Sequence, residues 1–477
     1  MESFDLLIVG GGINGAAIAR DAAGREQKVL LVERDDLAAH TSSASSKLIH
    51  GGLRYLEHGE LRLVRESLRE RAILLRTAPH IVRPLPFVLP QAKGMRPWWM
   101  LRSGLLLYDA LALGGGLPRA RGIGRSEAEY RAPLKAPARA ALYWDAWVDD
   151  ARLVVLNAVD AAERGAEIAT RTELLSARRE GERWIATLSG GRTVSAAAIV
   201  NAAGAWVSDV LKQRLESGSR SKVRLVKGSH IVVPRLFEGE HAYILQQPDG
   251  RVVFALPYGA YTLVGTTDVQ IDNPTEAAIT PAEVHYLCEA VNRYFKRQAQ
   301  PRQVVWSYSG VRSLHDDGAA SAQAVTRDYR LELDKAPGPK LLSVFGGKLT
   351  TARALAEEAL DKLGITSGRK VTATNFLPGG DIYPEYNNYL DRLAAWLPAP
   401  LLLRLGRGYG TRLKDVLGEA SSIRDLGRHF GAGLYEAELR YLREREFAQT
   451  VDDILWRRTK LGLEMSREEQ KALARFL

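Results

Sequence analysis

The sequence predicts an α/β protein that combines a mainly parallel sheet, a second domain built on an antiparallel sheet, and a C-terminal helical cap. Three features of the chain lead to this prediction. A glycine-rich turn separates an apolar strand from a helix near the N-terminus, hairpin patterns fill residues 222–268, and a helical, charged composition begins after Pro378-Gly379-Gly380. Elements in this succession are typical of a layered α/β fold.

The first predicted unit is a β-α-β segment over residues 4–33. A short strand (FDLLIV) runs into three glycines, a helical segment (INGAAIARDAAGR) follows, and a second strand (KVLLVE) ends at Glu33. Short apolar runs without polar alternation are typical of strands that are buried on both faces of a parallel sheet.

Residues 41–56 are rich in Ser and Gly and predict an extended loop. Residues 60–77 carry Leu, Val and Ile at three- and four-residue intervals between Arg and Glu, which indicates an amphipathic helix. The prolines of residues 79–97 predict a broken, irregular stretch, and a Leu-rich helical segment follows it.

The remaining elements follow from the same rules. Asp249-Gly250 marks a hairpin turn, and Pro281 suits the first turn of a helix. The other predicted elements are a strand at 193–204, a helix over Pro281–Phe295, strands near 304–309, 326–334 and 340–345, and a helix ending near Leu363.

The composition limits the possible class of protein. The chain has 477 residues, 46% apolar and 26% charged, with a formal net charge of +10, which excludes wholesale disorder. The single cysteine, Cys288, excludes an intrachain disulfide framework and indicates a reducing compartment. Cys288 falls on the apolar face of a predicted helix, so we expect it to be a buried packing residue. We find no signal peptide and no run of about 18 apolar residues.

The strongest motif is Gly10-x-Gly12-x-x-Gly15, between the first strand and the first helix. Glycines let the backbone turn tightly and approach a pyrophosphate, and the helix N-terminus offers free N–H groups there. Glu33 closes the next strand, where an acid accepts hydrogen bonds from a ribose. These features together predict a Rossmann-type dinucleotide site.

Two further strand ends favour FAD over NAD. The strand AAAIVNAAGAW (196–206) runs into Ala203-Gly204, and LLSVFGGKLTTAR (341–353) runs through Gly347 into a helix that begins near Thr350. A helix N-terminus in that place can stabilise negative charge on a reduced flavin.

Several strings together resemble the FAD-dependent, respiratory glycerol-3-phosphate dehydrogenase family. They are DLLIVGGGINGAAIARDAAG, TSSASSKLIHGGLRYLEHGELRLV (41–64), WVDDARLV (147–154), KGSHIVVP (227–234), GTTD (265–268), YSGVR (308–312), SVFGGKLTT (343–351) and WRRTKLG (456–462). The resemblance covers almost the whole chain.

The resemblance implies a DAAO-like (D-amino-acid-oxidase-like) FAD-binding fold in three parts. A discontinuous FAD-binding domain would comprise residues 1–75, 145–215 and 335–375. Residues 76–144 and 216–334 would form the substrate domain, and 380–477 the helical cap. The implied reaction oxidises sn-glycerol 3-phosphate to dihydroxyacetone phosphate and passes electrons through FAD to membrane quinone.

The resemblance also assigns roles at the substrate pocket. Arg54, Tyr55, Arg312, Arg327 and Lys348 would line it, with Arg312 and Arg327 as a phosphate clamp, because arginine stays protonated and offers a planar fork to an anion. The catalytic candidates are His50, Arg54 and Lys348.

His50 is the candidate general base, since the C2 hydroxyl proton must leave with the hydride and an imidazole can accept it. In the alternative, His50 only orders the loop or contacts the flavin, and Lys348 or water takes the proton.

The cofactor would contact residues from four segments, and we find no convincing metal-ligand spacing among the histidines. The expected cofactor residues are Gly10, Gly12, Ile13, Asn14, Gly15, Glu33, Thr41, Ser42, Ser43, Ser45, Lys47, Leu48, Ala203, Gly204, Trp206, Gly347, Lys348, Leu349 and Thr350.

We also expect peripheral binding at the inner face of the cytoplasmic membrane, and a homodimer remains possible. Basic residues beside Trp98 and Trp99, followed by SGLLLYDALAL (103–113), suit a bilayer interface. Nucleic-acid binding is disfavoured because basic residues alternate with acids. An oxidase of the same fold that uses oxygen, on a glycerol phosphate or an amine, is the alternative enzyme.

Overall fold

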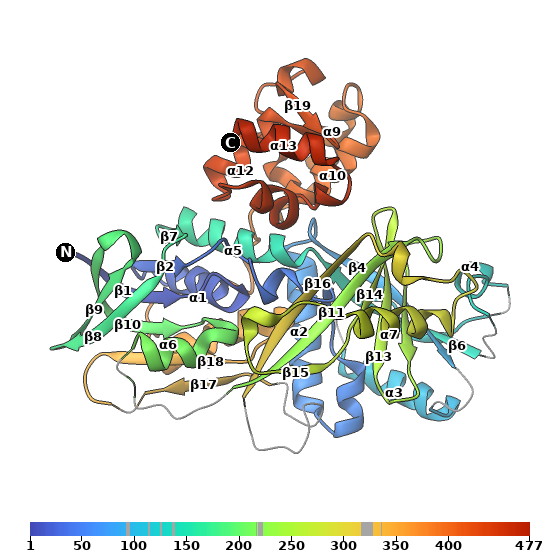
Figure 1. Ribbon diagram of the computed structural model, residues 1–477, viewed down its shortest axis with the longest axis horizontal. Coiled ribbons are helices and arrows are strands. Elements are labelled where there is room, and N and C mark those ends of the chain that lie inside the picture. The colour runs from blue at the N-terminus through green and yellow to red at the C-terminus, as the bar shows by residue number, and fades with distance from the viewer. Residues whose placement is uncertain are drawn as a thin grey trace.

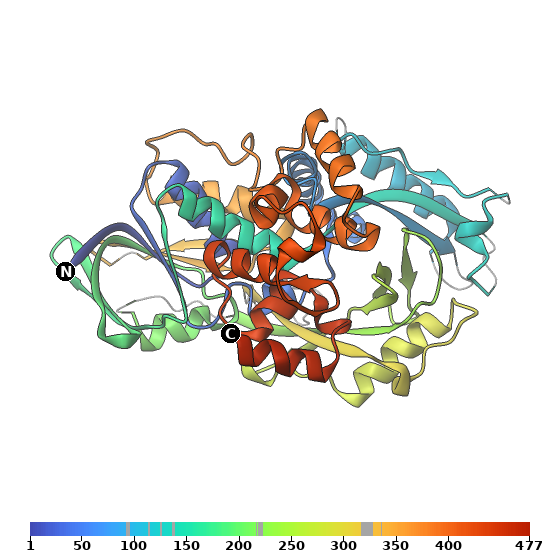
Figure 2. The same ribbon diagram turned by 90° about the horizontal axis from the view of Figure 1, so that it is seen from above.

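The computed structural model describes residues 1–91, 96–112, 115–124, 126–135, 139–215, 217, 223–315, 328–334 and 336–477, apart from the side chains of Arg54, Glu57 and His58. Two sheets lie side by side, and the C-terminal helical region covers them from one side (Figure 1). Seen from above, this region spans the junction between the two sheets (Figure 2).

The first sheet has the strand order β17-β18-β10-β1-β2-β7, and the hairpin β8-β9 joins it along β10. β1, β2, β7, β10 and β18 run parallel, while β9 and β17 pair antiparallel. Its strands are β1 (Glu2–Val9), β2 (Val29–Glu33), β7 (Glu167–Thr170), β8 (Leu174–Glu180), β9 (Arg183–Leu188), β10 (Thr193–Asn201), β17 (Arg330–Leu333) and β18 (Lys340–Phe345).

The second sheet is mostly antiparallel, in the order β15-β11-β14-β13-β12-β4-β6-β3, with β16 paired to β11 and β5 to β6. β4 and β12 are its one parallel pair within the described residues. Its strands are β3 (Leu48–Ile49), β4 (Val82–Gln91), β5 (Arg121–Gly122), β6 (Arg139–Val148), β11 (Val223–Pro234), β12 (Ala242–Gln246), β13 (Val252–Tyr258), β14 (Tyr261–Gly265), β15 (Val269–Ile271) and β16 (Trp306–His315).

Helices cover the sheets and form the cap, where β19 (His429–Gly431) and β20 (Leu434–Tyr435) add a small hairpin. The helices are α1 (Ile13–Gly24), α2 (Leu61–Thr77), α3 (Trp98–Leu111), α4 (Ala128–Arg131), α5 (Asp150–Glu163), α6 (Val207–Gln213), α7 (Pro281–Asn292), α8 (Ala352–Lys362), α9 (Pro384–Ala394), α10 (Ala399–Tyr409), α11 (Leu413–Leu417), α12 (Glu436–Arg445) and α13 (Arg467–Phe476).

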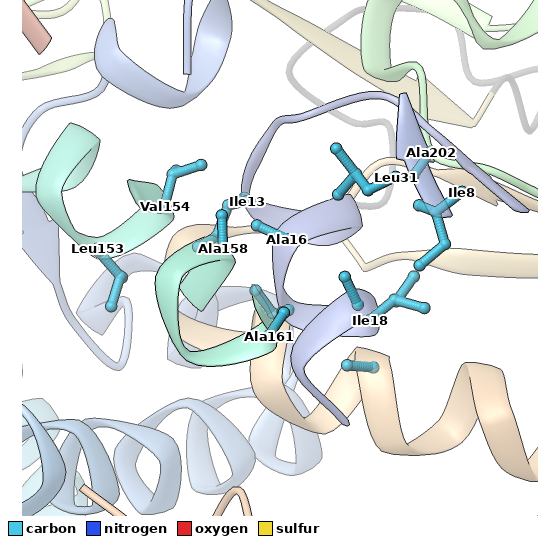
Figure 3. Close-up of a cluster of buried hydrophobic side chains, with 14 of the residues drawn as sticks. Ile8, Ile13, Ala16, Ile18, Leu31, Leu153, Val154, Ala158, Ala161 and Ala202 are labelled. Carbon is cyan, nitrogen blue, oxygen red and sulfur yellow. The ribbon is translucent and has the colours of Figure 1, made fainter. Parts of the chain in front are cut away.

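The first helix, α1, lies between the parallel sheet and α5. Figure 3 shows Ile8 and Leu31 of the strands on one side of it and Ala158 and Ala161 of α5 on another. Small side chains such as Ala16 let these elements approach closely, so the N-terminal end of α1 is held firmly against the sheet.

The predicted β-α-β unit and the helix over 60–77 are confirmed, as are the hairpin at Asp249-Gly250 and the burial of Cys288 on α7. The Ser/Gly-rich segment 41–56 is only partly a loop, because Leu48 and Ile49 pair with β6 and Leu53–His58 form a 3-10 turn. The helix predicted to reach Phe295 ends at Asn292.

The prediction of an irregular stretch at 79–97 is wrong, because Val82–Gln91 form a ten-residue strand. Pro84, Pro86 and Pro90 occupy alternate positions of it, so their missing N–H groups all fall on one edge. β4 pairs with β6 along its whole length, so the edge that carries the prolines faces away from β6. On that edge β12 pairs only with Phe87 and Val88, so the missing N–H groups interrupt few hydrogen bonds.

The domain boundaries drawn from the sequence stay a prediction. By hydrogen bonding, β3 and all of β6 belong to the second sheet, and β17 belongs to the first. The two sheets therefore exchange segments at the junction where the candidate site lies.

Candidate active site

The glycine turn before α1 leaves no room for side chains. Gly10 has φ +113°, and a Cβ there would lie 2.6 Å from the carbonyl oxygen of Ala202. A Cβ on Gly15 would lie 1.9 Å from the carbonyl oxygen of Gly10. At Gly12 the nearest atom to such a Cβ is Ser42 Oγ, at 3.1 Å, and Ser42 Oγ accepts the N–H of Ile13. The turn and the helix start thus form a tight backbone cradle.

Glu33 ends β2 beside this cradle and is buried. Its Oε2 accepts the N–H of Gly11 at 2.6 Å, and its Oε1 accepts the N–H of Asp35 at 2.9 Å. Burial raises the pKa of Glu33, although the two backbone hydrogen bonds act against that rise.

A first cavity of about 220 Å³ lies against the glycine turn. Gly10, Gly12, Glu33, Ala203 and Trp206 are among the residues that line it. The Arg34 guanidinium lies 4.3 Å from the Trp206 ring centroid, and His40 packs on the same ring. The cavity therefore has an aromatic wall, an acidic group and a helix N-terminus, which is the combination that suits a nucleoside diphosphate.

A second cavity of about 330 Å³ lies at the junction of the two sheets. It shares Thr41, Ser42 and Gly204 with the first cavity, so the two form one elongated site. Phe87, Tyr143 and Phe254 of the second sheet form an apolar wall of the second cavity. An elongated site of this kind can hold a dinucleotide at one end and a small substrate at the other.

The turn after β18 closes the second cavity. Asn14 donates from Nδ2 to the carbonyl oxygen of Gly346 at 3.0 Å, which ties the start of α1 to this turn. Gly347 has φ +101°, and a Cβ there would lie 2.7 Å from Asn14 Nδ2. The turn before α1 and the turn after β18 therefore both approach the cavity at a glycine whose positive φ and close neighbours exclude a side chain.

Lys348 Nζ is buried and has no hydrogen-bond partner among the described residues. It lies 4.1 Å from the centroid of the Tyr55 ring. His50 lines the same cavity, and its backbone N–H donates to Thr350 Oγ1 at 3.4 Å. A buried ammonium without an oxygen partner points to an anion or a polar group as its ligand.

Arg312 reaches the cavity from β16. Its Nη1 is paired with the carboxylate of Asp268, and Nη2 lies 3.5 Å from Thr266 Oγ1. A Cβ on Gly228 of the adjacent strand would lie 2.7 Å from Arg312 Nη2. Gly228 therefore leaves the space in which the guanidinium lies.

His230 is a cavity residue that the sequence analysis missed. Its Nε2 is hydrogen-bonded to Ser46 Oγ at 2.9 Å, its ring stacks on Tyr308, and its Nδ1 has no partner among the described residues. Burial, with Lys47 and Arg312 nearby, lowers the pKa of His230 well below its usual value, so the ring is neutral. The sequence did carry a signal for this residue, because Gly228-Ser229-His230 is a polar run inside an otherwise apolar strand.

A buried network supports the His50 loop from below. The hydroxyl of Tyr108 on α3 accepts the N–H of Gly51 at 2.8 Å and donates to the carboxylate of Asp145 at 2.8 Å. Arg71 Nη1 donates to the same carboxylate at 2.5 Å. A buried hydrogen-bond network of this kind fixes the loop backbone beside His50.

The structure brings most of the predicted residues to one or both cavities, and Arg54 (its side chain) and Arg327 lie outside the described residues. The cavity-lining residues from the sequence analysis are Gly10, Gly12, Ile13, Asn14, Glu33, Thr41, Ser42, Ser45, Leu48, His50, Tyr55, Ala203, Gly204, Trp206, Arg312, Gly347, Lys348, Leu349 and Thr350.

Gly15, Ser43 and Lys47 were expected at the cofactor and line neither cavity. Gly15 packs against Gly10. Lys47 is fully buried, and its Nζ donates to both carboxylate oxygens of Asp150, at 2.8 and 2.9 Å, and to the carbonyl oxygen of Ser43. In this structure these residues hold the loop behind the cavity wall.

Glu33, Asp35 and His40 place possible metal-ligand atoms within 4.8 Å of one another. The Asp35 carboxylate is hydrogen-bonded to His40 Nε2 at 2.8 Å, and Glu33 accepts two backbone N–H groups. Because these groups are already engaged with protein donors, we assign them no metal.

Comparison with known proteins places this site in a family. A family model described as FAD dependent oxidoreductase matches residues 5–365, and one described as the C-terminal domain of alpha-glycerophosphate oxidase matches residues 370–477. The glycerol-3-phosphate dehydrogenase of Pseudomonas aeruginosa is 50% identical, over 100% of this chain and 95% of that protein. The chain belongs to the FAD-dependent glycerol-3-phosphate dehydrogenase family.

Other members of the wider group are similar as well. The D-erythritol 1-phosphate dehydrogenase of Brucella abortus is 49% identical, over 100% of this chain and 98% of that protein. The solved glycerol-3-phosphate dehydrogenase of Bacillus halodurans, complexed with FAD, superposes with a TM-score of 0.73 at 26% identity, covering 100% of this chain and 94% of that chain.

FAD is the cofactor of this dehydrogenase family member, and the described residues fit it. The glycine cradle has no space for a Cβ at Gly10 or Gly15. Glu33 ends the second strand, and the joined cavities lead from there to the buried Lys348 Nζ. These features offer backbone N–H groups, a ribose acceptor and a cation along one path.

Proposed function

We propose that this enzyme oxidises sn-glycerol 3-phosphate to dihydroxyacetone phosphate and passes the electrons to a membrane quinone. The observation that supports the substrate is the convergence of His50, Tyr55, Arg312 and Lys348 on one cavity at the flavin end of the FAD site. The full-length similarity to a glycerol-3-phosphate dehydrogenase supports it independently.

The phosphate is the group that distinguishes this substrate from glycerol. We assign its recognition to Arg312 and Lys348, with Arg54 and Arg327 as further arginines of the clamp. The ion pair with Asp268 fixes the Arg312 guanidinium before the substrate binds. A preorganised arginine loses less entropy when it pairs with a phosphate oxygen.

Oxidation at C2 removes a hydride from carbon and a proton from the hydroxyl group. FAD, when bound, supplies the hydride acceptor. His50 takes the hydroxyl proton in this proposal, and its loop is held for that task by the Tyr108 hydrogen bond to the N–H of Gly51. Lys348 or a water molecule remains the alternative proton acceptor.

We assign a positioning role to His230. Its ring is neutral, its Nε2 is taken by Ser46, and the unpartnered Nδ1 belongs to a side chain that lines the cavity. A neutral imidazole can hydrogen-bond a hydroxyl group of the substrate without competing for the phosphate.

D-erythritol 1-phosphate is the second candidate substrate, because a dehydrogenase of that name is 49% identical over the whole chain. It carries a secondary alcohol next to a phosphorylated carbon, as glycerol 3-phosphate does. Its longer carbon chain needs more room in the second cavity. The ratio of kcat/KM for the two substrates decides between them.

The test of the proposed function is anaerobic mixing of the holoenzyme with sn-glycerol 3-phosphate while the flavin absorbance near 450 nm is followed. Bleaching, with formation of dihydroxyacetone phosphate, is the expected result. If D-erythritol 1-phosphate bleaches the flavin and sn-glycerol 3-phosphate does not, D-erythritol 1-phosphate is the substrate. Reoxidation by air with stoichiometric hydrogen peroxide, faster than by a short-chain quinone, would make the enzyme an oxidase instead.

A peripheral association with the inner face of the membrane follows from the proposed quinone. Within the described residues, we find no helix with the length and apolar character needed to cross a bilayer. α3 instead exposes Trp99, Met100, Leu106 and Leu107, with Trp99 72% exposed. We propose this face of α3 as the membrane contact. The homodimer stays a prediction that sedimentation can test.

A further inference from the structure

A separate cavity of about 1010 Å³ lies between the cap and the second sheet. We call it the cap cavity. β4, the β13-β14 turn, α10 and the segment Arg458–Glu464 contribute its walls. None of the predicted cofactor or substrate residues that the structure describes lines it. At this size it can hold an organic molecule as well as an inorganic ion.

Two arginines of the cap cavity lack a carboxylate partner among the described residues. Arg83 of β4 lies over the Trp147 ring, 4.4 Å from its centroid, and its buried Nε has no hydrogen-bond partner. Arg407 of α10 is exposed and forms no ion pair within the part of the chain that the structure describes. Burial and the charge of Arg407 lower the pKa of Arg83 to about 10, although the carboxylates of Glu240 and Asp149 oppose this change.

The other cations of the cap cavity have partners. Arg404 pairs with Glu438 at 2.7 Å, and Arg458 pairs with Asp36 at 2.9 Å. Arg152 pairs with Glu446, and Lys460 lies 3.6 Å from Asp149. Glu240 and Glu464 add acidic groups to the wall. Among the described residues of the wall, Arg83 and Arg407 are therefore the cations that form no ion pair, and Glu240 and Glu464 balance their charge.

Two further buried polar groups point to a ligand. Tyr258 is only 7% exposed, and its hydroxyl has no hydrogen-bond partner among the described residues. His80 is 4% exposed, and its ring nitrogens form no hydrogen bond of good geometry with a described residue, although the backbone of Pro378 lies near enough to raise its pKa against the effect of burial. Both side chains line the cap cavity. Buried donors without partners cost free energy, and a ligand that accepts their hydrogen bonds would remove that cost.

We propose that the cap cavity binds a soluble organic phosphate at a site separate from the active site. The guanidinium groups of Arg83 and Arg407 and the Tyr258 hydroxyl donate hydrogen bonds to the phosphate oxygens. The organic part packs on apolar residues of α10, including Leu401 and Leu403. The acidic groups in the wall disfavour an acyl chain, so the phosphate comes from solution and not from a lipid headgroup.

Such a ligand contacts both the cap and the second sheet, because Arg407 belongs to the cap and Arg83 and Tyr258 belong to the sheet. It therefore stabilises the docked position of the cap. A ligand that binds only the folded, docked state raises the unfolding temperature as its concentration increases.

The test uses pyrophosphate as the probe and the FAD-loaded full chain as the protein. Equilibrium binding is measured for wild type, for Arg83→Gln with Arg407→Gln, and for a control with Arg65→Gln and Arg424→Gln, two exposed arginines. We expect the double variant Arg83→Gln with Arg407→Gln to bind pyrophosphate at one site about ten-fold more weakly than wild type, or weaker still. The control variant should bind as wild type does. Arg407→Gln alone keeps the buried Arg83 in place and should show part of the loss.

Arg312→Ala separates this site from the active site. The proposal is overturned if Arg312→Ala abolishes all pyrophosphate binding, or if the Arg83 and Arg407 pair binds as wild type does. Flotation on phosphatidylglycerol vesicles tests the source of the phosphate. Suppose that the Arg83→Gln, Arg407→Gln variant loses vesicle binding and that wild type binds no pyrophosphate at the cap cavity. The ligand is then a lipid, and the proposal of a soluble phosphate is wrong. Flavin absorbance confirms that each variant is folded.

Discussion

Arg458 donates two hydrogen bonds, each 2.9 Å long, from Nη1 and Nη2 to the two carboxylate oxygens of Asp36. Both side chains are buried, and Arg457 Nε adds a third hydrogen bond at 2.6 Å. Asp36 follows Glu33 of the FAD site by three residues. The cap is therefore anchored at the strand end that is expected to hold the ribose of FAD.

Asp36→Asn should loosen both the cap and the cofactor. It leaves the buried Arg458 without a carboxylate, whereas Arg457 keeps Asp453, and breaking a buried pair costs about 3 to 5 kcal/mol. Thermal unfolding and the ratio of flavin to protein absorbance measure the two effects. Asp391→Asn, at an exposed position of α9, is the matched control. Full cofactor content and unchanged cleavage by protease between sheet and cap would contradict the role of Asp36 as an anchor.

Gly12→Val should give apoprotein. Its side chain would occupy the space in front of the helix N-terminus, where the Cβ alone already comes within 3.1 Å of Ser42 Oγ. The flavin content after purification, with circular dichroism to report folding, checks this. Gly104→Val on the exposed side of α3, where a Cβ meets no atom within 4 Å, should keep its FAD. A yellow, active Gly12→Val enzyme would place the pyrophosphate elsewhere.

Arg312→Ala should lower kcat/KM for glycerol 3-phosphate by roughly 30- to 1000-fold, the equivalent of about 2 to 4 kcal/mol. Bound FAD and any slow turnover of glycerol should change little, because only the phosphorylated substrate uses the guanidinium. Steady-state kinetics with both alcohols measure the ratio. Equal proportional losses for the two alcohols would show that Arg312 supports the flavin or the fold.

His50→Ala is the comparison for Arg312→Ala, because the hydroxyl proton is common to both alcohols. We expect it to lower both activities by about 100-fold or more. Asp268→Asn should have a smaller effect, about 3- to 10-fold and mainly on KM, since it frees the Arg312 guanidinium without removing its charge. A kcat loss as large as that of His50→Ala would give Asp268 a direct part in the chemistry.

Trp99→Ser with Leu106→Ser should weaken binding to anionic liposomes by about 30-fold, because both side chains are exposed on α3 and apolar contact with the bilayer contributes on the order of 1 kcal/mol each. Trp98 is a poor choice for this test, since it packs against the core of the second sheet. Val305→Ser with Leu175→Ser, two exposed residues elsewhere, is the control. Equal flotation of both pairs would remove α3 as the membrane contact.

Glu283 should contribute to the acid sensitivity of the enzyme. Although burial raises its pKa, hydrogen bonds from Lys227, Thr267 and Ser229 outweigh that effect and lower the pKa to about 2 from an ordinary value of 4.5. Between these values the unfolded chain binds more protons than the folded chain. The stabilising contribution of Glu283 is therefore complete above about pH 4.5 and is lost as the pH falls towards 2.

Glu283→Gln should lower the free energy of unfolding near neutral pH by about 1 to 3 kcal/mol and flatten its decline at acid pH. Urea unfolding at a series of pH values from 3 to 7 measures both changes. Glu289→Gln lies at an exposed position of the same helix and should match wild type. A parallel decline in wild type and Glu283→Gln would assign the acid sensitivity to other groups.

Local patterns of the sequence determined the β-α-β unit, the amphipathic α2 and the hairpin at Asp249-Gly250, because burial period and turn chemistry depend on residues that are neighbours in the chain. They were misleading at β4. Prolines disrupt a helix and the hydrogen bonding of a central strand, which is why the sequence predicts an irregular stretch there. A strand tolerates them on an edge that has few hydrogen-bond partners, and only the assembled sheet shows which edge of β4 this is.

At the site, the sequence motifs and the family resemblance identified the glycine cradle, Glu33, His50, Arg312 and Lys348. Only the tertiary structure showed that Lys47 pairs with Asp150, that Asp268 pairs with Arg312, and that His230 lines the second cavity. It also joined Asp36 to Arg458, 422 positions away, and placed Arg83 and Arg407 in one cavity with no ion pair to either among the described residues. The physical reason is that periodicity records which face of an element is buried, whereas the partner of a charge depends on how distant segments pack together.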